Sequence, residues 1–213
     1  MGGRLPASRV SAAEDFIRAR LVLTPLSFRP DIALYQPTPQ SGIAGLLESQ
    51  GHAGAPPYWA YAWAGGAALA LYLRDNPQAV SGRTVLDFGA GSGLVGIAAA
   101  LAGASHVTAY EPDPLGRIAL RLNAEANRAM LTIGERPEVA ELVLAGDVFY
   151  DAKTARATLP ALRALAREGA TVLVGDPFRR DLPLSALNHL ADYAVPDMGS
   201  GAAVSAAIFA LHP

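Results

Sequence analysis

An aspartate and a tyrosine with Asp-x-x-Tyr spacing, Asp147 and Tyr150, directly follow the apolar segment 141–145. A carboxylate accepts hydrogen bonds from an amine, and a tyrosine ring can contact an aliphatic stem or a cation. The simpler interpretation makes Asp147 a turn residue and Tyr150 a surface ring. Asp151 precedes a helical segment and is better explained as its N-cap. The spacing predicts Asp147 and Tyr150 as catalytic residues at the end of a strand.

A second group of candidate residues lies in a glycine-rich turn between the apolar segment 84–88 and a helical segment. Gly89, Gly91 and Gly93 allow the backbone to turn sharply and to approach a ligand, and the following helix presents free amides. Asp87 stands two residues before the first glycine. We predict these four residues to bind a cofactor.

Glu111 stands at the end of the next apolar segment after this turn, in the position of an acid that accepts hydrogen bonds from ribose hydroxyls. The motif G-x-G-x-x-G is also matched, by Gly91, Gly93 and Gly96. The spacing alone therefore does not exclude a nicotinamide dinucleotide as the cofactor. Asp87 favours S-adenosylmethionine, because its carboxylate can pair with the ammonium of an amino-acid cofactor, a group that a dinucleotide lacks.

Short β-branched segments alternate with helical ones from residue 84 onward, which predicts parallel strands joined by helical crossovers. The expected strands are 84–88, 106–111, 131–133, 141–145, 171–175 and 204–211. The expected helices are 59–76, 94–102, 114–130, 152–167 and 184–193. A turn at 199–201 with Val195 before it suggests that the last strand closes an antiparallel hairpin. The fold class is therefore a doubly wound, mainly parallel α/β sheet.

The N-terminal part has a different character. Ser11 and Glu14 form a capping-box pattern, which predicts a helix over 11–23. Residues 27–57 are rich in proline and glycine and are expected to form an ordered arm. We divide the chain into an N-terminal helix and arm, 1–56, and a cofactor-binding domain, 57–213.

Composition narrows the function classes. Seventeen basic and 19 acidic residues give a net charge of −2, which disfavours nucleic acid as a partner. The sequence has no cysteine, and its four histidines lack ligand spacing, so we expect no metal site. The apolar segments are far shorter than the roughly 20 residues that span a bilayer. We expect a monomer in the cytoplasm, with no membrane contact.

Taken together, these motifs resemble the seven-β-strand, class I protein-lysine methyltransferases, and most closely the electron-transfer flavoprotein β-subunit lysine methyltransferase group and its bacterial relatives. The resemblance covers about residue 57 to the C-terminus. The matching segments are 57–60, 63–66, 87–93, 103–105, 111–114, 123–128, 146–151 and 175–177. Ala64 stands where the group usually has proline. Separately, the segment 128–141 is shorter than in the group, so the group's adenine contacts are not carried over.

The resemblance implies a Rossmann-like, seven-stranded sheet with an antiparallel last strand, S-adenosyl-L-methionine as cofactor, and a lysine of the electron-transfer flavoprotein β subunit as substrate. Asp147 would orient the amine, while Tyr150 and Trp59 line its channel. Trp63 would pack beside the cofactor. Asp176 points to the same edge of the sheet.

Three functions remain open: protein-lysine methylation, methylation of a small molecule on nitrogen, and cofactor binding without catalysis for docking a partner. Arg179 and Arg180 could contact an acidic partner, although a solvated pair of charges is the simpler interpretation.

Overall fold

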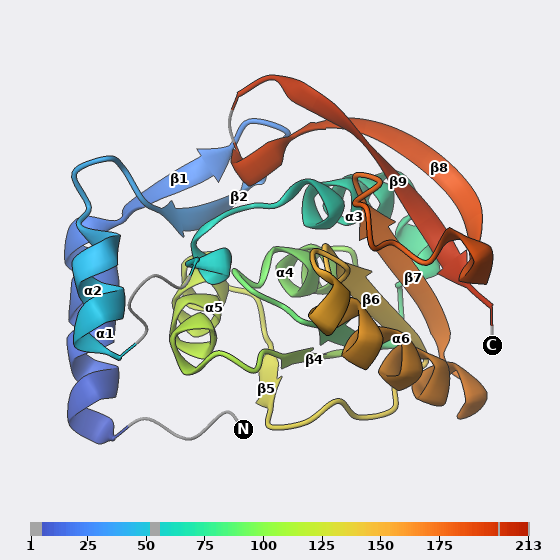
Figure 1. The fold of residues 1–213 in the computed structure, drawn as a ribbon, viewed down its shortest axis with the longest axis horizontal. Helices are drawn as coiled ribbons and strands as arrows, with labels where there is room; N and C mark the ends of the chain where they lie inside the picture. The colour runs from blue at the N-terminus through green and yellow to red at the C-terminus, as the bar shows by residue number, and fades with distance from the viewer. Residues whose placement is uncertain (1–5, 52–55, 200, 213) are drawn as a thin grey trace.

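A computed structural model describes residues 6–51, 56–199 and 201–212, and its centre is a seven-stranded sheet with the order β5-β4-β3-β6-β7-β9-β8 (Figure 1). The first five strands in this order are parallel, whereas β9 pairs antiparallel with β7 and β8 pairs antiparallel with β9. The strands are β3 (Thr84–Phe88), β4 (His106–Tyr110), β5 (Thr132–Gly134), β6 (Leu142–Gly146), β7 (Thr171–Asp176), β8 (Leu187–Pro196) and β9 (Ala203–Leu211). The predicted fold class is confirmed.

Alternation along the strands separates the core into two layers. In β6, Leu142 and Leu144 pack with α3 and α4 on one face, whereas Val143 and Ala145 pack with α6 on the other. This is the pattern of a strand buried on both faces. The helices of this region are α3 (Ala64–Asp75), α4 (Leu94–Leu101), α5 (Pro114–Ala126) and α6 (Ala152–Arg167). Within the described residues, no helix is both long and apolar enough to cross a membrane.

The N-terminal end of α3 lies directly against the ends of β6 and β7, and glycine makes this approach possible. A methyl group on Gly65 would overlap the carbonyl oxygen of Gly175. A methyl group on Gly146 would lie 2.9 Å from the Cα of Gly66. The residue before α3 is thereby placed beside the carboxyl edge of the sheet.

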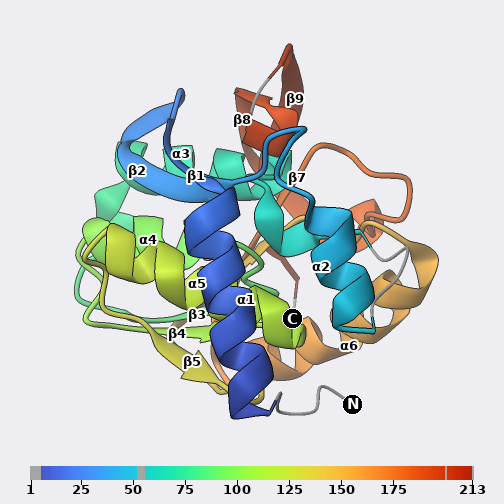
Figure 2. The ribbon, with the colours of Figure 1, turned by 90° about the vertical axis from the view of Figure 1, so that its left-hand side faces the viewer.

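The N-terminal arm packs on α5 (Figure 2). It consists of α1 (Ala7–Arg20), β1 (Val22–Leu26), β2 (Arg29–Gln36) and α2 (Ile43–Ser49), with β1 and β2 antiparallel. The Ala33 N–H donates to Asn127 Oδ1 and the Tyr35 N–H to Asn123 Oδ1, both at 2.8 Å. The Nδ2 group of Asn123 donates to the carbonyl of Ser92 at 2.8 Å. One α5 side chain thus connects the arm to the glycine-rich turn.

Two helix predictions near the arm need correction. The first helix begins at Ala7 after Pro6 and ends at Arg20, because the residues beyond it pair with β2 as β1. The capping box at Ser11 is therefore inside the helix. The predicted helix 59–76 is a short 3-10 turn, Tyr58–Ala60, followed by α3, which begins only at Ala64.

The predicted helix 184–193 is wrong. Only Leu184–Ala186 forms a 3-10 turn, and the rest belongs to β8, which pairs with β9 along its length. The leucines and alanines of this segment favour a helix in isolation, but pairing with a neighbouring strand overrides that propensity. The predicted hairpin is confirmed, with Val195 opposite Val204. The middle residue of its predicted turn, Ser200, lies outside the described residues.

The contact between α3 and the sheet predicts a large effect of one methyl group. The added carbon of Gly175→Ala has no space against the backbone of Gly65. This variant should therefore destabilise the protein by about 2 kcal/mol or more, the usual cost of forcing an extra carbon into a packed interior.

Gly45→Ala is the matched control, since Gly45 is an exposed helical residue of α2 with nothing within 4 Å of the added carbon. It should stabilise the protein by about 0.5 kcal/mol, because alanine favours the helix more than glycine does. Chemical denaturation measures both values. Equal stability of the two variants would contradict the proposed contact.

Candidate functional site

The glycine-rich turn between β3 and α4 has the conformation that its sequence predicts. Gly89, Gly91 and Gly93 have φ angles of +72°, +53° and +83°. Residues with a side chain rarely adopt this region. The N–H groups of Gly89 and Ala90 each donate to the carbonyl of Tyr110 at 2.9 Å, which fixes the turn against the end of β4. The backbone at the three glycines is therefore free of side chains and firmly held.

Asp87 lies at the end of β3 and is 1% exposed. Its Oδ2 accepts a hydrogen bond from the N–H of Gly96 in α4 at 2.8 Å. Burial raises the pKa of Asp87 to about 7, and the negative charge of Glu111 acts in the same direction, while the Gly96 N–H opposes both. A cation beside this carboxyl would favour its charged form.

Glu111 follows β4 and lies beside the turn. Its Oε2 accepts from the N–H of Gly91 and its Oε1 from the N–H of Asp113, both at 2.7 Å. Burial raises its pKa to about 6, against the effect of these two donors. Each carboxylate oxygen keeps a second lone pair for a further donor.

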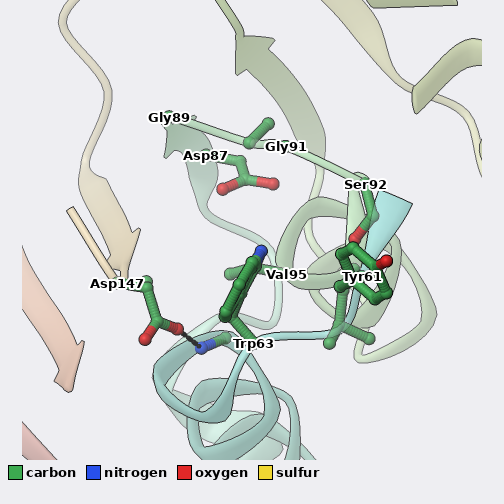
Figure 3. Close-up of a pocket in the computed structure, with 12 residues that line it drawn as sticks. Tyr61, Trp63, Asp87, Gly89, Gly91, Ser92, Val95 and Asp147 are labelled. Carbon is green, nitrogen blue, oxygen red and sulfur yellow. Dashed lines mark hydrogen bonds between the residues drawn. The ribbon is translucent and has the colours of Figure 1, made fainter. Parts of the chain in front are cut away.

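A cavity lies at the carboxyl edge of the sheet, between the glycine-rich turn and the residues before α3 (Figure 3). Five of the predicted site residues line it: Trp63, Asp87, Gly89, Gly91 and Asp147. The other three predicted residues lie outside this lining: Gly93 caps α4, Glu111 supports the turn, and Tyr150 lies on the exposed rim. The ends of β3 and β6 and the starts of α3 and α4 therefore meet at one cavity.

The two tryptophans before α3 have different positions. The indole Nε1 of Trp63 donates to the carbonyl of Tyr58 at 2.7 Å, and Figure 3 shows the ring between Asp147 and Tyr61. Trp59 is 1% exposed and packs with residues of the arm and α5, so the prediction that it lines a channel is wrong. Tyr61, which the sequence analysis did not select, lines the cavity instead.

Asp147 is held at both carboxylate oxygens. Its Oδ2 accepts from the N–H of Gly66 at 2.9 Å. Its Oδ1 accepts from Nη2 of Arg179 at 2.7 Å and from Nε at 3.1 Å. Asp147 also has a φ of +55°, an uncommon conformation for a residue with a side chain. Burial raises the pKa of Asp147 above its usual value, although Arg179 and the Gly66 N–H act in the opposite direction.

Tyr150 stands at the entrance side of this edge, where its ring stacks on that of Tyr58 with centroids 4.7 Å apart. The two residues are 41% and 40% exposed. Asp151 caps α6, as predicted, by accepting from the N–H of Thr154 at 2.7 Å. Of this exposed pair, Tyr58 also contacts the cavity residue Trp63, with ring centroids 5.9 Å apart, and neither tyrosine is part of the lining.

The two adjacent arginines after β7, Arg179 and Arg180, have different surroundings. Arg180 has 87% of its side chain exposed, as expected for a solvated charge. Arg179 points inward to Asp147 and lies over the Trp63 ring, with its guanidinium carbon 5.7 Å from the centroid. Asp176 is fully buried, and its Oδ1 accepts from the N–H of Arg179 at 2.7 Å. In the sequence, the spacing of Asp176 at a strand end and Arg179 three residues later was the available signal for this hydrogen bond between Asp176 and Arg179.

The chemistry of the lining suits a cationic ligand. Asp87 and Asp147 supply two carboxylates, Glu111 supports the turn with a third, and Trp63 and Tyr61 supply aromatic faces. The turn between them has no side chain that would block a ligand at Gly89 and Gly91.

The strand order and the glycine-rich turn define the fold of a class I methyltransferase. The family model for ribosomal protein L11 methyltransferase (PrmA) matches residues 67–149. The solved structure of the 16S rRNA N2 G1207 methyltransferase (RsmC) of T. thermophilus, in complex with AdoMet and guanosine, has a TM-score of 0.50 and 22% identity over 70% of this chain and 43% of that one.

Curated relatives identify the family more closely. The electron transfer flavoprotein beta subunit lysine methyltransferase of Xenopus laevis is 42% identical over 66% of this chain and 62% of its own length. The Rattus norvegicus protein of the same name is 36% identical over 74% of this chain and 68% of its own. The chain belongs to the electron transfer flavoprotein beta subunit lysine methyltransferase family. The match spans about three fifths of the Xenopus protein's length.

The raised pKa of Asp87 predicts a pH-dependent stability. The folded protein binds this proton more tightly than the unfolded chain does. The carboxyl therefore lowers stability progressively as the pH rises from 3.8 to about 7. Asp87→Asn removes the titration and keeps an acceptor for Gly96. Its gain in Tm over the parent protein should be about 5 °C or more larger at pH 8 than at pH 5. Calorimetric melts at both pH values test this, and an equal difference at both would contradict it.

Proposed function

We propose that this chain is an S-adenosylmethionine-dependent protein-lysine N-methyltransferase and that its substrate is the electron transfer flavoprotein beta subunit. The observation that carries the proposal is the position of Asp147 in the same cavity as Asp87 and the glycine-rich turn. A group that can orient an amine is thus adjacent to a site suited to a cationic cofactor. The name of the Xenopus and Rattus relatives supports the choice of substrate.

The cavity fits the proposed cofactor better than a dinucleotide. Asp87 would pair with its ammonium, Glu111 would accept from its ribose hydroxyls, and Trp63 would contact its apolar part. Gly89, Gly91 and Gly93 would allow its close approach to the backbone. A pyrophosphate at the glycine-rich turn would instead have to approach the Asp87 carboxylate, and this repulsion disfavours NAD. When bound, S-adenosylmethionine supplies a methyl group on a sulfonium.

Asp147 carries the chemistry that the chain itself contributes. A lysine amine has an unperturbed pKa of about 10.4, so it arrives protonated at neutral pH and must give up its proton to water before its lone pair can attack. The ionised Asp147 accepts a hydrogen bond from the amine and holds its lone pair in one direction. Alignment of this kind accounts for much of the rate in a transfer between two bound groups.

Tyr58 and Tyr150 form the contact for the rest of the substrate. The Tyr58 ring stacks on that of Tyr150 and lies 5.9 Å from the ring of the cavity residue Trp63, between centroids. Together their faces suit the methylene stem of a lysine and its cationic end. Both rings are about two fifths exposed, which leaves them accessible to a side chain that projects from a protein surface. This exposure favours a macromolecular substrate over a small molecule. The monomeric state and the cytoplasmic location remain predictions from the sequence.

The function is tested by transfer from labelled S-adenosylmethionine to purified electron transfer flavoprotein beta subunit. The parent protein should label the subunit on lysine, as read by mass spectrometry. Asp147→Asn should lower transfer about 100-fold or more, because the amine loses its charged acceptor, while calorimetry finds cofactor affinity unchanged. Transfer within about threefold of the parent rate would remove Asp147 from the mechanism.

The assay has a built-in control, because the chain contains a single lysine, Lys153. Lys153→Arg removes the one lysine side chain that could label itself, so labelling of the subunit is measured against a lysine-free enzyme. Labelling of a small molecule alone in a lysate would support the second function of the sequence analysis. Cofactor binding without any labelling would support the third.

A pair of glycine variants tests the cofactor site. Gly91→Val and Gly82→Val place a β-branched residue at φ angles of +53° and +74°. Both should lower Tm, because such a residue is strained there. Only Gly91 of the two lines the cavity. Gly91→Val alone should therefore weaken binding of S-adenosylmethionine, by about tenfold or more. Titration calorimetry of the folded variants measures the affinities, and equal affinity of the two would contradict a cofactor at this turn.

A further inference from the structure

Arg179 is held through both its backbone and its side chain. Asp176 accepts its backbone N–H, and the turn between them places Phe178 at a φ of +61°. The Phe178 ring then packs edge-on against Phe209 of β9, with centroids 5.7 Å apart. The side chain of Arg179 is only 24% exposed and lies over the Trp63 indole. The loop after β7 therefore directs this guanidinium at the cavity.

The guanidinium and the first turn of α3 hold Asp147 from opposite sides. Arg179 donates twice to Oδ1, whereas the Gly66 N–H donates to Oδ2. Rotation of the carboxylate would break charge-assisted hydrogen bonds, which are stronger than neutral ones. The orientation of the acceptor is thus fixed before a substrate arrives.

The negative charges around Asp147 make a nearby cation necessary to keep its carboxyl ionised, and Arg179 supplies it. Asp147 is 8% exposed, and Asp176 and Asp197 add negative charge from the ends of β7 and the β8–β9 connection. Burial and the negative charge of Asp197 raise the pKa of Asp147, and the charge of Asp147 in turn raises the pKa of Asp176. Arg179 opposes them, with help from the neutral Gly66 N–H. A protonated Asp147 would be unable to accept as a carboxylate does.

We propose that Arg179 is a positioning residue, which keeps the Asp147 carboxylate ionised and oriented toward the substrate amine. The inference rests on the proposed function. It assigns to Arg179 an action through Asp147 and no contact with the reacting atoms. It also explains why the two adjacent arginines are differently placed, since only the first has a carboxylate of the cavity within reach.

The test compares Arg179→Met, Arg179→Gln and the matched control Arg180→Met. Lysine is not used at position 179, because an amine beside Asp147 could itself become a substrate. For each folded variant, kcat and KM for the electron transfer flavoprotein beta subunit are measured from pH 6 to pH 10, with cofactor affinity from calorimetry. The pH range is about that over which a perturbed carboxyl and a lysine both titrate.

Arg179→Met should lower kcat about 30-fold with cofactor affinity within about twofold of the parent, as expected for loss of a charge-assisted hydrogen bond. The acid limb of kcat/KM should move up by about one pH unit or more, because loss of the cation raises the pKa of Asp147. Arg179→Gln keeps a donor without the charge, so it should recover part of kcat and retain the shifted limb. Arg180→Met should match the parent.

Three results would overturn the inference. A lower KM with unchanged kcat in Arg179→Met would make Arg179 an obstacle to the substrate. An unshifted acid limb in Arg179→Gln would show that the charge has no part, and this variant decides the question if Arg179→Met fails to fold. If Arg180→Met were as impaired as Arg179→Met, the effect would come from the loss of any nearby positive charge and not from the contact of Arg179 with Asp147. Failure of the parent protein to methylate the subunit would instead contradict the proposed function.

Discussion

The close approach of α3 to the ends of β6 and β7 is the constraint on which the cavity depends. Gly65 and Gly175 bring the two backbones together, and any side chain at either position would separate them. Because the helix starts at this contact, Trp63 is placed beside the sheet edge and the Gly66 N–H reaches Asp147. A packing requirement of small residues thus creates the geometry in which the polar groups meet.

Within this frame the site consists of carboxyl groups whose surroundings differ. Asp87 and Glu111 are buried and accept hydrogen bonds from backbone donors, and burial raises the pKa of each. Asp147 has an arginine as well, which opposes the same effect of burial. The cavity therefore combines carboxyls that a cationic ligand would ionise with one that is already paired. This difference is the physical basis for separating cofactor binding from orientation of the amine.

The parallel strands β3, β6 and β7 were predictable because each is a short, mostly buried segment of apolar and β-branched residues. The strand Thr84–Phe88 has the predicted bounds, and the glycine-rich turn after it makes the predicted sharp turn, with positive φ angles at its glycines. β8 was not predictable, since it lies at the sheet edge, exposes many of its side chains and contains residues that favour helices. Arg179 was missed for a related reason. Its partner comes from another strand, and only the tertiary fold shows that the turn after β7 directs the side chain inward.

The Asn123 side chain joins two regions that the sequence suggested were separate. Its amide receives the Tyr35 N–H of the arm through Oδ1 and donates through Nδ2 to Ser92 in the glycine-rich turn. Asn123 is fully buried, so deleting β2 would remove the partner of an interior amide oxygen, which is costly. Residues 57–213 are therefore expected to be less stable without the arm. A shortened version that starts at residue 57 would keep the Asn123–Ser92 hydrogen bond and lose the Tyr35 donor that fixes the other end of the same amide.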